Sequence, residues 1–533
     1  MPQQKFDAMK KTFFTCLTVC LTLLSCSKNG VEGVRSSEDS SRLSHGMIVL
    51  GERLNNPYTV ENVRDAYTGV YPTRSSSDIQ TTHLYVRFLP KTEADFRTLE
   101  AYGVSLLDHP MDYRIVQDGD YYHDPQLPQE QITWQYAVVD KAFHFPSGVY
   151  YEVIDECCLT ENLSYTRAME GVDWAAVEKE AYRISGNEQM YEACFTKAGE
   201  VQPTGRITIC DPDYLSGRPV GLSGVRIMTN IFVKFATTYT DRDGYYTIPK
   251  KYNGKPYYRV VFKNEKGFAI GFNWVLVPAS VSTLGKNGPE GLDYCITRDS
   301  DYELFTRGIV NNAAYEYFNR CDKSDLDIAL PPSNLRFWMF KHLNVSSAVM
   351  LQQGAFYYST LIGNTLGEYT KLLELFSPDI TIGTKDYGQP YHIYASVVHE
   401  MAHASHFSSV GTGYWDIYIK DILEGYVRSG FTDPYGNGTE ENAGYCAVGE
   451  MWAYYLSSKL FEDRYHKGFA TFGSGNWFYP QILTSLGERG FSPNDIFSVL
   501  TEGVHDCEKL KTALIEKFPS RRQVVEQVFE RYE

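Results

Sequence analysis

The chain has 533 residues, about three to four times the length of a typical domain, so a single hydrophobic core is not expected. Hydrophobic residues make up 43% of the sequence and charged residues 22%, and the mean hydropathy is −0.33, which argues against a disordered chain and against a bundle of membrane helices. The 66 acidic and 50 basic residues give a formal net charge of −16, which argues against nucleic acid and anionic membrane surfaces as binding partners.

The first 25 residues predict an export signal. Lys10-Lys11 precede an apolar run over residues 12–24, which is too short to cross a bilayer as a permanent helix. The run closes with Leu23-Leu24-Ser25-Cys26, which resembles the bacterial lipobox, and the resemblance implies lipid attachment at Cys26. We therefore expect an exported bacterial lipoprotein, anchored in the membrane by its lipid at the outer membrane or cell surface. Residues 26–45, rich in Ser, Gly and charge, are its predicted tether. An ordinary signal with an incidental cysteine is the alternative.

Residues 46–200 predict a mixed α+β module. Thr82–Phe88 alternates as a strand does, Thr92–Tyr102 has helical periodicity behind a threonine cap, and Val104–Leu107 resumes a strand. This order indicates a β-α-β unit. The module carries no motif of known chemistry, and we interpret it as scaffold, with a docking or pro-region-like role as the alternative.

Residues 203–298 predict an all-β domain. Short alternating runs, among them Gly205–Cys210, Gly224–Ile227 and Thr240–Ile248, are separated by Gly, Asp and Pro turns, a pattern typical of a small sandwich. Asp243-Gly244 supplies a tight turn. The order of these runs resembles the carboxypeptidase regulatory-like, transthyretin-related domain. The resemblance implies a spacer or accessory module rather than a ligand-binding one.

The cysteines outside the signal leave their pairing open. Cys16, Cys20 and Cys26 belong to the signal segment, so eight of the eleven cysteines remain, and no CxxC pair among them suggests a zinc knuckle or a redox site. An oxidising compartment permits disulfides, and Cys210 and Cys295 bracket the predicted β domain. Spacing does not give the disulfide connectivity, so disulfide bridges and buried free thiols both remain possible states of these cysteines.

From residue 300 to residue 533 helical periodicity dominates. The predicted helices are Tyr302–Cys321, Tyr391–Phe407, Tyr445–Phe461 and the charged end Cys507–Tyr532. One strand-like stretch, Asp379–Gly383, lies just before the second of these helices. It is either an edge strand that pairs with an extended substrate or an ordinary strand of a sheet.

The second predicted helix contains His399-Glu400-Met401-Ala402-His403, which is the HExxH pattern. Residues four apart on a helix stand one above the other, so His399 and His403 can grip one Zn²⁺. Glu400 lies about 100° around the helix, where it can face a water at the metal without ligating it. The flanking residues are apolar, and a carboxylate buried there without a cation would be costly.

A catalytic zinc site needs a third protein ligand, and three residues are candidates. Three imidazoles at His399, His403 and His406 would spread over about 10 Å of helix axis, so His406 is interpreted as supporting the site or facing the substrate. Glu424 is followed at once by a glycine, which suits a helix end. Glu450 lies inside a long apolar helix between Gly449 and Met451, and we favour it over Glu424.

HExxH followed by glutamate in a later Gly-Glu-x-Trp-Ala helix resembles the gluzincin metallopeptidases, in particular zinc-binding metallopeptidases among bacterial lipoproteins. The resemblance covers residues 300–533. It implies that His399, His403 and Glu450 hold zinc and that Glu400 is the general base of peptide hydrolysis. The donor that stabilises the oxyanion is left open among Tyr414, Tyr445 and His406.

The sequence thus predicts a multidomain chain: an α+β N-terminal module, an all-β sandwich in the middle and a mainly α, zincin-like catalytic domain at the C-terminal end. The predicted function is a zinc-dependent peptide hydrolase at the bacterial cell envelope, acting on peptide or protein substrates. Two alternatives remain. One is a non-catalytic surface-binding lipoprotein with a zincin-like scaffold, and the other is a peptidase of glycoproteins, suggested by the 41 Tyr, 29 Phe and 7 Trp residues.

Overall fold

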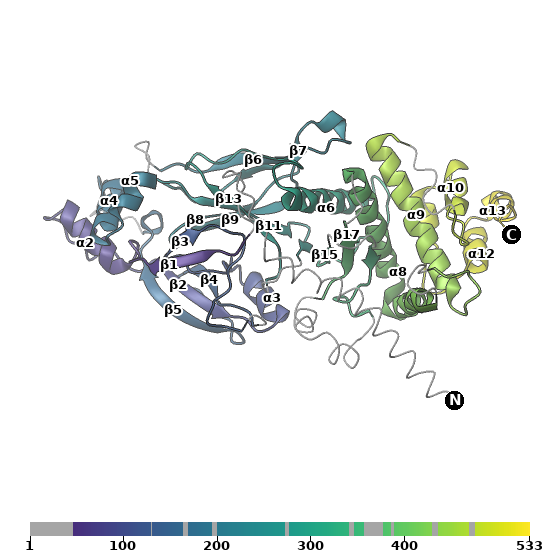
Figure 1. Cartoon of the computed structure of the whole chain (residues 1–533), viewed down its shortest axis with the longest axis horizontal. Coiled ribbons are helices and arrows are strands. Elements are labelled where there is room, and N and C mark those ends of the chain that lie inside the picture. The colour runs from purple at the N-terminus through teal and green to yellow at the C-terminus, as the bar shows by residue number, and fades with distance from the viewer. Residues whose placement is uncertain are drawn as a thin grey trace, which may run out of the picture.

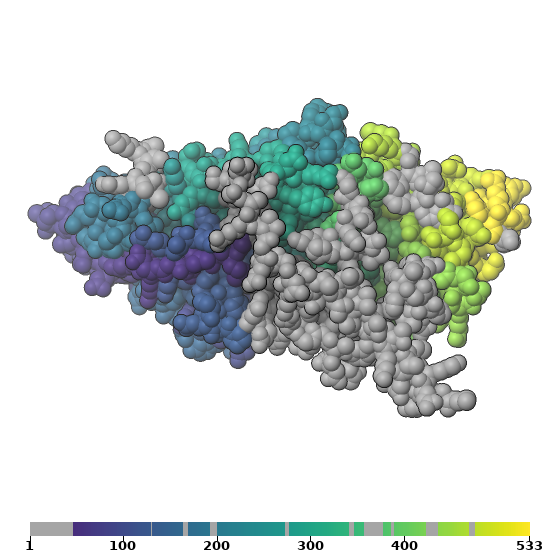
Figure 2. Space-filling model, in the orientation of Figure 1, coloured from purple at the N-terminus to yellow at the C-terminus, as the bar shows by residue number. Residues whose placement is uncertain are grey.

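The computed structural model describes residues 46–128, 131–163, 169–194, 200–271, 277–340, 346–355, 377–384, 389–428, 435–467 and 475–532. The predicted signal, the tether and Cys26 lie outside these ranges. The described chain mixes helices with several sheets and ends in a helical region (Figure 1). Figure 2 shows an elongated molecule, with the N-terminal residues (purple and blue) at one end and the C-terminal helices (yellow) at the other. Over the described ranges, none of the helices combines the length and the apolar character needed to span a bilayer.

The described part of the N-terminal region, residues 46–200, contains two small antiparallel sheets and four α-helices, of which α4 contacts both α2 and α5. Strand β2 lies between β4 and β5, and β1 pairs with β3. The elements are β1 (Val49–Arg53), α2 (Val60–Val70), β2 (His83–Leu89), α3 (Glu93–Ala101), β3 (Tyr113–Gln117), β4 (Gln135–Asp140), β5 (Tyr150–Cys157), α4 (Trp174–Ile184) and α5 (Glu188–Cys194).

The predicted strand and helix at 82–102 are confirmed, but the strand predicted at Val104–Leu107 is wrong. Thr92 caps α3 as expected, with its side chain accepting from the backbone N–H of Asp95. At the other end of α3 the N–H of Val104 donates to the carbonyl of Leu99 beyond a left-handed Gly103. Val104 therefore ends the helix and does not begin a strand. Strand β2 pairs with β4 and β5, so these residues do not form a β-α-β unit.

The middle β region, residues 204–296, supplies strands to two sheets. One sheet has the order β10-β6-β14 with β7 beside β6, and the other runs β16-β17-β15-β12-β11-β8-β9 with β13 beside β11. The strands are β6 (Thr204–Ile209), β7 (Val220–Gly221), β8 (Val225–Ile231), β9 (Lys234–Tyr239), β10 (Tyr245–Thr247), β11 (Tyr257–Asn264), β12 (Ala269–Ile270), β13 (Val281–Lys286) and β14 (Tyr294–Ile296). The predicted turn at Gly244 has φ +84°, and a Cβ there would lie 2.1 Å from the carbonyl oxygen of Ile207.

The second sheet continues past residue 300 into the C-terminal part of the chain. Short strand β12 pairs in parallel with β15 (Arg336–Phe340), which pairs in parallel with β17 (Ile380–Gly383). Strand β16 (Ser347–Ala348) covers the other side of β17. The predicted strand at 379–383 is thus present as Ile380–Gly383. Because β16 pairs with Ile380 and Thr381, the structure favours the ordinary sheet strand over the free edge for substrate.

Helices make up the rest of the C-terminal part. They are α6 (Tyr302–Arg320), α8 (Pro390–Arg428), α9 (Ala443–Tyr465), α10 (Gln481–Glu488), α11 (Pro493–Phe497), α12 (Cys507–Lys517) and α13 (Arg522–Phe529). The predicted helices from 302, 391 and 445 are confirmed within them. The predicted helical end at 507–532 is divided into α12 and α13, because Phe518 ends α12 and Pro519 follows it. Helices α8 and α9 run side by side (Figure 1), and one continuous hydrophobic core extends from Ile207 in β6 to Phe529 in α13.

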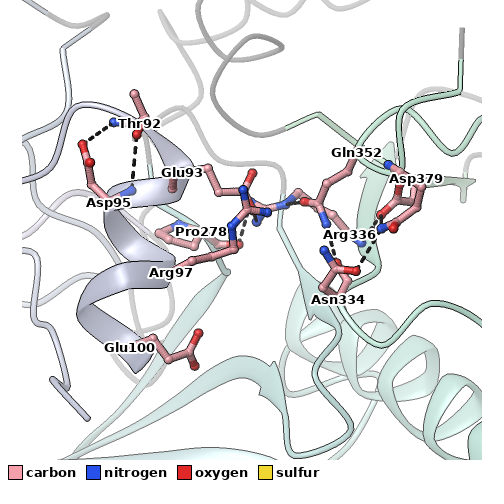
Figure 3. Close-up of polar contacts among 12 residues, drawn as sticks. Thr92, Glu93, Asp95, Arg97, Glu100, Pro278, Asn334, Arg336, Gln352 and Asp379 are labelled. Atoms are coloured by element: carbon pink, nitrogen blue, oxygen red, sulfur yellow. Dashed lines mark hydrogen bonds and ion pairs between the residues drawn. The ribbon is translucent and has the colours of Figure 1, made fainter. Parts of the chain in front are cut away.

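Ion pairs, of which the Arg336–Glu93 pair is largely buried, connect the N-terminal region to both later parts. The guanidinium of Arg336 in β15 reaches Glu93 of α3 at 2.7 Å and also donates to the carbonyl of Pro278 (Figure 3). Glu100, two turns further along α3, pairs with Arg226 of β8 and with Lys263 of β11. These residues line a cavity of about 130 Å³ between α3 and the middle β region.

Candidate metal centre

Helix α8 carries the two histidines and the glutamate of the HExxH pattern in its first half. His403 and Glu400 are buried, whereas the side chain of His399 keeps 14% of its surface exposed. The helix is broken at Gly411, whose φ of 78° only glycine adopts without strain. The break turns the second half of α8 back, so the ring of Trp415 lies 5.8 Å from that of His403.

Helix α9 brings Glu450 to the same place. Gly449 lets the two helices approach closely, since a Cβ at this position would lie 3.3 Å from the Tyr418 ring and 3.9 Å from Cε1 of His403. One turn on, the indole N–H of Trp452 donates to the carbonyl of Ala402 at 3.2 Å. The small residue and the buried hydrogen bond together fix α9 against the first half of α8.

The donor atoms of His399, His403 and Glu450 converge on one point. The Nε2 atoms of the two histidines are 3.2 Å apart, and each lies 3.4 Å from a carboxylate oxygen of Glu450. Zinc bonds of 2.0–2.1 Å in a tetrahedral arrangement place donor atoms about 3.3–3.4 Å apart. The two Nε2 atoms have about this spacing, each faces a different oxygen of Glu450, and one donor atom from each of the three side chains lies within 4.8 Å of the others. The group could therefore hold one metal ion.

One buried carboxylate oxygen of this group has no partner. Glu450 Oε2 is buried and has no hydrogen-bond partner among the described residues. Burial alone would raise the pKa of Glu450, but the neighbouring imidazoles outweigh burial and hold that pKa well below its usual range. A buried carboxylate that stays ionised facing two imidazole nitrogens fits a metal ion as the missing partner.

Tyr418 is a part of the centre that the sequence analysis missed. Its hydroxyl donates to Glu450 Oε1 at 2.6 Å and lies 3.5 Å from Nε2 of His403. The hydroxyl therefore orients the carboxylate from behind. The signal in the sequence is slight, because Tyr418 follows HExxH by fifteen residues and only the break at Gly411 returns it to the histidines.

Two further tyrosines border the more exposed side of the centre. The ring of Tyr454 lies 4.6 Å from the His399 ring in an edge-on arrangement, and the hydroxyls of Tyr454 and Tyr435 are 3.2 Å apart. Burial raises the pKa of Tyr454 above its usual value, with the charge of Glu450 adding to the shift. The Tyr454 hydroxyl therefore keeps its proton at neutral pH and can donate it in a hydrogen bond.

Glu400 lies in an almost anhydrous setting. Its side chain is 5% exposed, and burial raises its pKa to about 8, with the charge of Glu450 adding to the shift and that of His399 opposing it. A divalent cation held by the neighbouring donor atoms would pull that pKa down. The position suits a group that exchanges a proton rather than one that forms a permanent ion pair.

The described part of the structure does not add any of the remaining candidates to the three donor residues. His406 is fully buried between the rings of Tyr414 and Trp415, so it does not face a substrate, and burial lowers its pKa to about 3. The Tyr414 hydroxyl donates to the carbonyl of Tyr445 at 3.4 Å. Glu424 belongs to α8, but its side chain lies outside the described part of the structure.

No model of a known protein family matches the sequence. A search of curated proteins likewise finds no match for it.

Proposed function

We propose that the chain is a zinc-dependent peptide hydrolase in which His399, His403 and Glu450 hold Zn²⁺ and Glu400 is the general base. The observation that carries the proposal is the convergence of two Nε2 atoms, 3.2 Å apart, on the buried Glu450 carboxylate, whose two oxygens each lie 3.4 Å from one of these nitrogens. Two imidazoles and one carboxylate are a ligand set of catalytic zinc, which leaves a fourth position for water or substrate.

Bound zinc would supply a Lewis acid that acidifies water and polarises a carbonyl. Glu400 directly follows the ligand His399 on the same helix, so its carboxylate lies near the metal position. From there it can accept a proton from the attacking water and return it to the leaving amine. Burial raises the pKa of Glu400 and a bound cation would lower it, and these opposing effects suit a group that must both take and give a proton.

The Tyr454 and Tyr435 hydroxyls are the proposed donors to the developing oxyanion. They lie beside His399, the most exposed of the three ligands, and so on the side from which a substrate can enter. A phenol that keeps its proton donates without a change in charge. Tyr418 is not proposed as a donor to the oxyanion, because its hydroxyl already donates a hydrogen bond to Glu450.

We also propose a role for each region of the chain and a location for the protein. The helical region from residue 300 is a gluzincin-like catalytic region, the strands of 204–296 are a carboxypeptidase regulatory-like accessory module that shares one sheet with it, and residues 46–200 are an N-terminal module packed against both. Cys26 carries the lipid that anchors the exported chain at the bacterial envelope.

The test measures zinc and peptide hydrolysis together on the purified chain without its signal. Wild type should hold one zinc per chain and cleave unstructured peptides, and a chelator should remove both properties. Glu400→Gln should keep the zinc while the hydrolysis rate falls by about 10²–10⁴-fold, because an amide cannot accept the proton. A wild-type chain that binds zinc but hydrolyses no peptide supports the non-catalytic alternative instead.

A further inference from the structure

We infer that Cys210 and Cys295 form a disulfide in the mature protein. Cys210 directly follows β6, and Cys295 is the central residue of β14, which runs parallel to β6. Thr208 pairs with Cys295 in the register, and the N–H of Cys210 donates to the carbonyl of Ile296 at 3.0 Å. The two cysteines are therefore diagonal neighbours on one face of the sheet, and their sulfur atoms lie 2.9 Å apart.

The surroundings single out this pair among the cysteines whose side chains are described. Cys295 is exposed and Cys210 partly exposed, whereas four of the remaining five are buried. Those four are Cys157, Cys158, Cys321 and Cys446, and the fifth, Cys507, packs against Met451. Within the described residues the only His, Cys, Asp and Glu group with metal-ligand spacing is the one at His399, so the thiol pair is not half of a second metal site.

The two sulfurs can be oxidised by thiol–disulfide exchange with an oxidised dithiol protein or with oxidised glutathione. The thiolate of the more exposed Cys295 attacks the oxidant's disulfide and releases one thiol, which leaves a mixed disulfide on Cys295. The sulfur of Cys210 then attacks Cys295 and displaces the second thiol. Two electrons and two protons pass to the oxidant for the one S–S bond formed. An exported chain meets such oxidants, and a cytosolic one does not keep the bond.

The bond would fix more than the two strands. Its cysteines are 85 positions apart, so it closes a loop that holds nearly the whole middle β region. The residue after Cys210 is Asp211, which is buried and accepts a hydrogen bond from the Tyr465 hydroxyl at 2.9 Å. Tyr465 is the last residue of α9, the helix that carries Glu450. The disulfide thus holds the contact at which the C-terminal end of α9 meets the β region.

The experiment examines the full mature chain after treatment with oxidised glutathione. Without reductant its intact mass should be about 2 Da below that of the reduced chain, for the two hydrogens lost. A peptide map made under the same conditions should contain a crosslinked pair of fragments, one with Cys210 and one with Cys295. Both residues carrying free thiols, or glutathione, after this treatment would overturn the inference, as would a crosslink to any other cysteine.

Variants give an independent measurement. Cys210→Ser should leave exactly one additional alkylatable thiol, at Cys295, and Cys295→Ser one at Cys210, when the denatured chains are alkylated without reductant. Cys321→Ser, a buried control, should not change the labelling of the pair. Reductant should lower the melting temperature of the wild type and leave that of the Cys210→Ser, Cys295→Ser double variant unchanged. If a variant does not fold, the wild-type peptide map alone decides.

Discussion

The Tyr418 hydroxyl lies 2.6 Å from Oε1 of Glu450 and donates to it from the returning half of α8. The carboxylate that would ligate zinc is therefore held by a neutral donor on one oxygen and left without a partner on the other. A ligand prepared in this way loses little freedom when the metal binds.

Tyr418→Phe should weaken zinc binding while the fold persists. Removing the hydroxyl leaves Glu450 Oε1 without its donor, and losses of this kind cost metal sites about 10–100-fold in affinity. Competition with a chromogenic chelator measures the change. Tyr414→Phe is the matched control, because that hydroxyl donates to a backbone carbonyl at 3.4 Å and makes no hydrogen bond to the three donor residues within the described part of the chain. Equal zinc affinity in both variants would show that Tyr418 does not position Glu450.

Glu450→Gln should lose stoichiometric zinc, whereas Glu424→Gln should retain it. In the first variant a neutral amide replaces an anionic oxygen ligand. The zinc affinity should therefore fall by more than about 100-fold, which is the upper cost of removing a residue that only hydrogen-bonds a ligand. Metal analysis after gel filtration gives the answer for both proteins. The opposite pattern would make Glu424 the third ligand.

Gly449→Ala should reduce zinc affinity, although alanine favours a helix. The new Cβ would lie 3.3 Å from the Tyr418 ring, so the ring or the helix must shift by a few tenths of an ångström. Gly413→Ala is the matched control in α8, since its Cβ would meet only a glutamate oxygen at 4.0 Å. The control should be stabilised by about 0.5–1 kcal/mol with unchanged zinc binding. Equal gains in stability and unchanged zinc affinity in both variants would contradict close packing at Gly449.

Asp379, buried just before β17, should make stability depend on pH. Burial raises its pKa to about 7, against about 3.9 in the unfolded chain, so the folded state binds the extra proton between these values. Its contribution is therefore fully present below about pH 4 and is lost as the pH rises through 7. Asp379→Asn should cost about 2 kcal/mol more at pH 5 than at pH 8, measured by urea unfolding. A cost independent of pH would mean that the carboxyl is ionised throughout, held by its bonds from Arg336 and Gln353.

The sequence predicted the features that depend on neighbouring residues. Helical periodicity located α6, α8 and α9, the Thr92 cap located the start of α3, and the spacing of His399 and His403 required only one helix. Glu450 was favoured on the cost of burying a lone carboxylate, and the structure places it beside both histidines.

The features that depend on distant parts of the chain could not be predicted in this way. Val104 is a residue type common in strands, yet its N–H donates to the last turn of α3. The position next to β2 that a following strand would take is occupied by β4, which lies more than thirty residues further along the chain. Tyr418 reaches the centre only through the break at Gly411, and a single glycine in a helical pattern does not say in which direction the chain returns. The covering of β17 by β16 likewise depends on two residues that carry no strand pattern.

The pairing of β12 with β15 has a consequence for dividing the chain. A fragment starting at residue 300 would keep the HExxH helix but leave β15 with a bare edge, because Ala269 and Gly271 now donate to the carbonyls of Leu335 and Phe337 there. Exposed edges recruit other strands, and buried Phe337 would face water as well. Expression of that fragment should give aggregates, and the shortest soluble unit with the three donor atoms should include the middle β region.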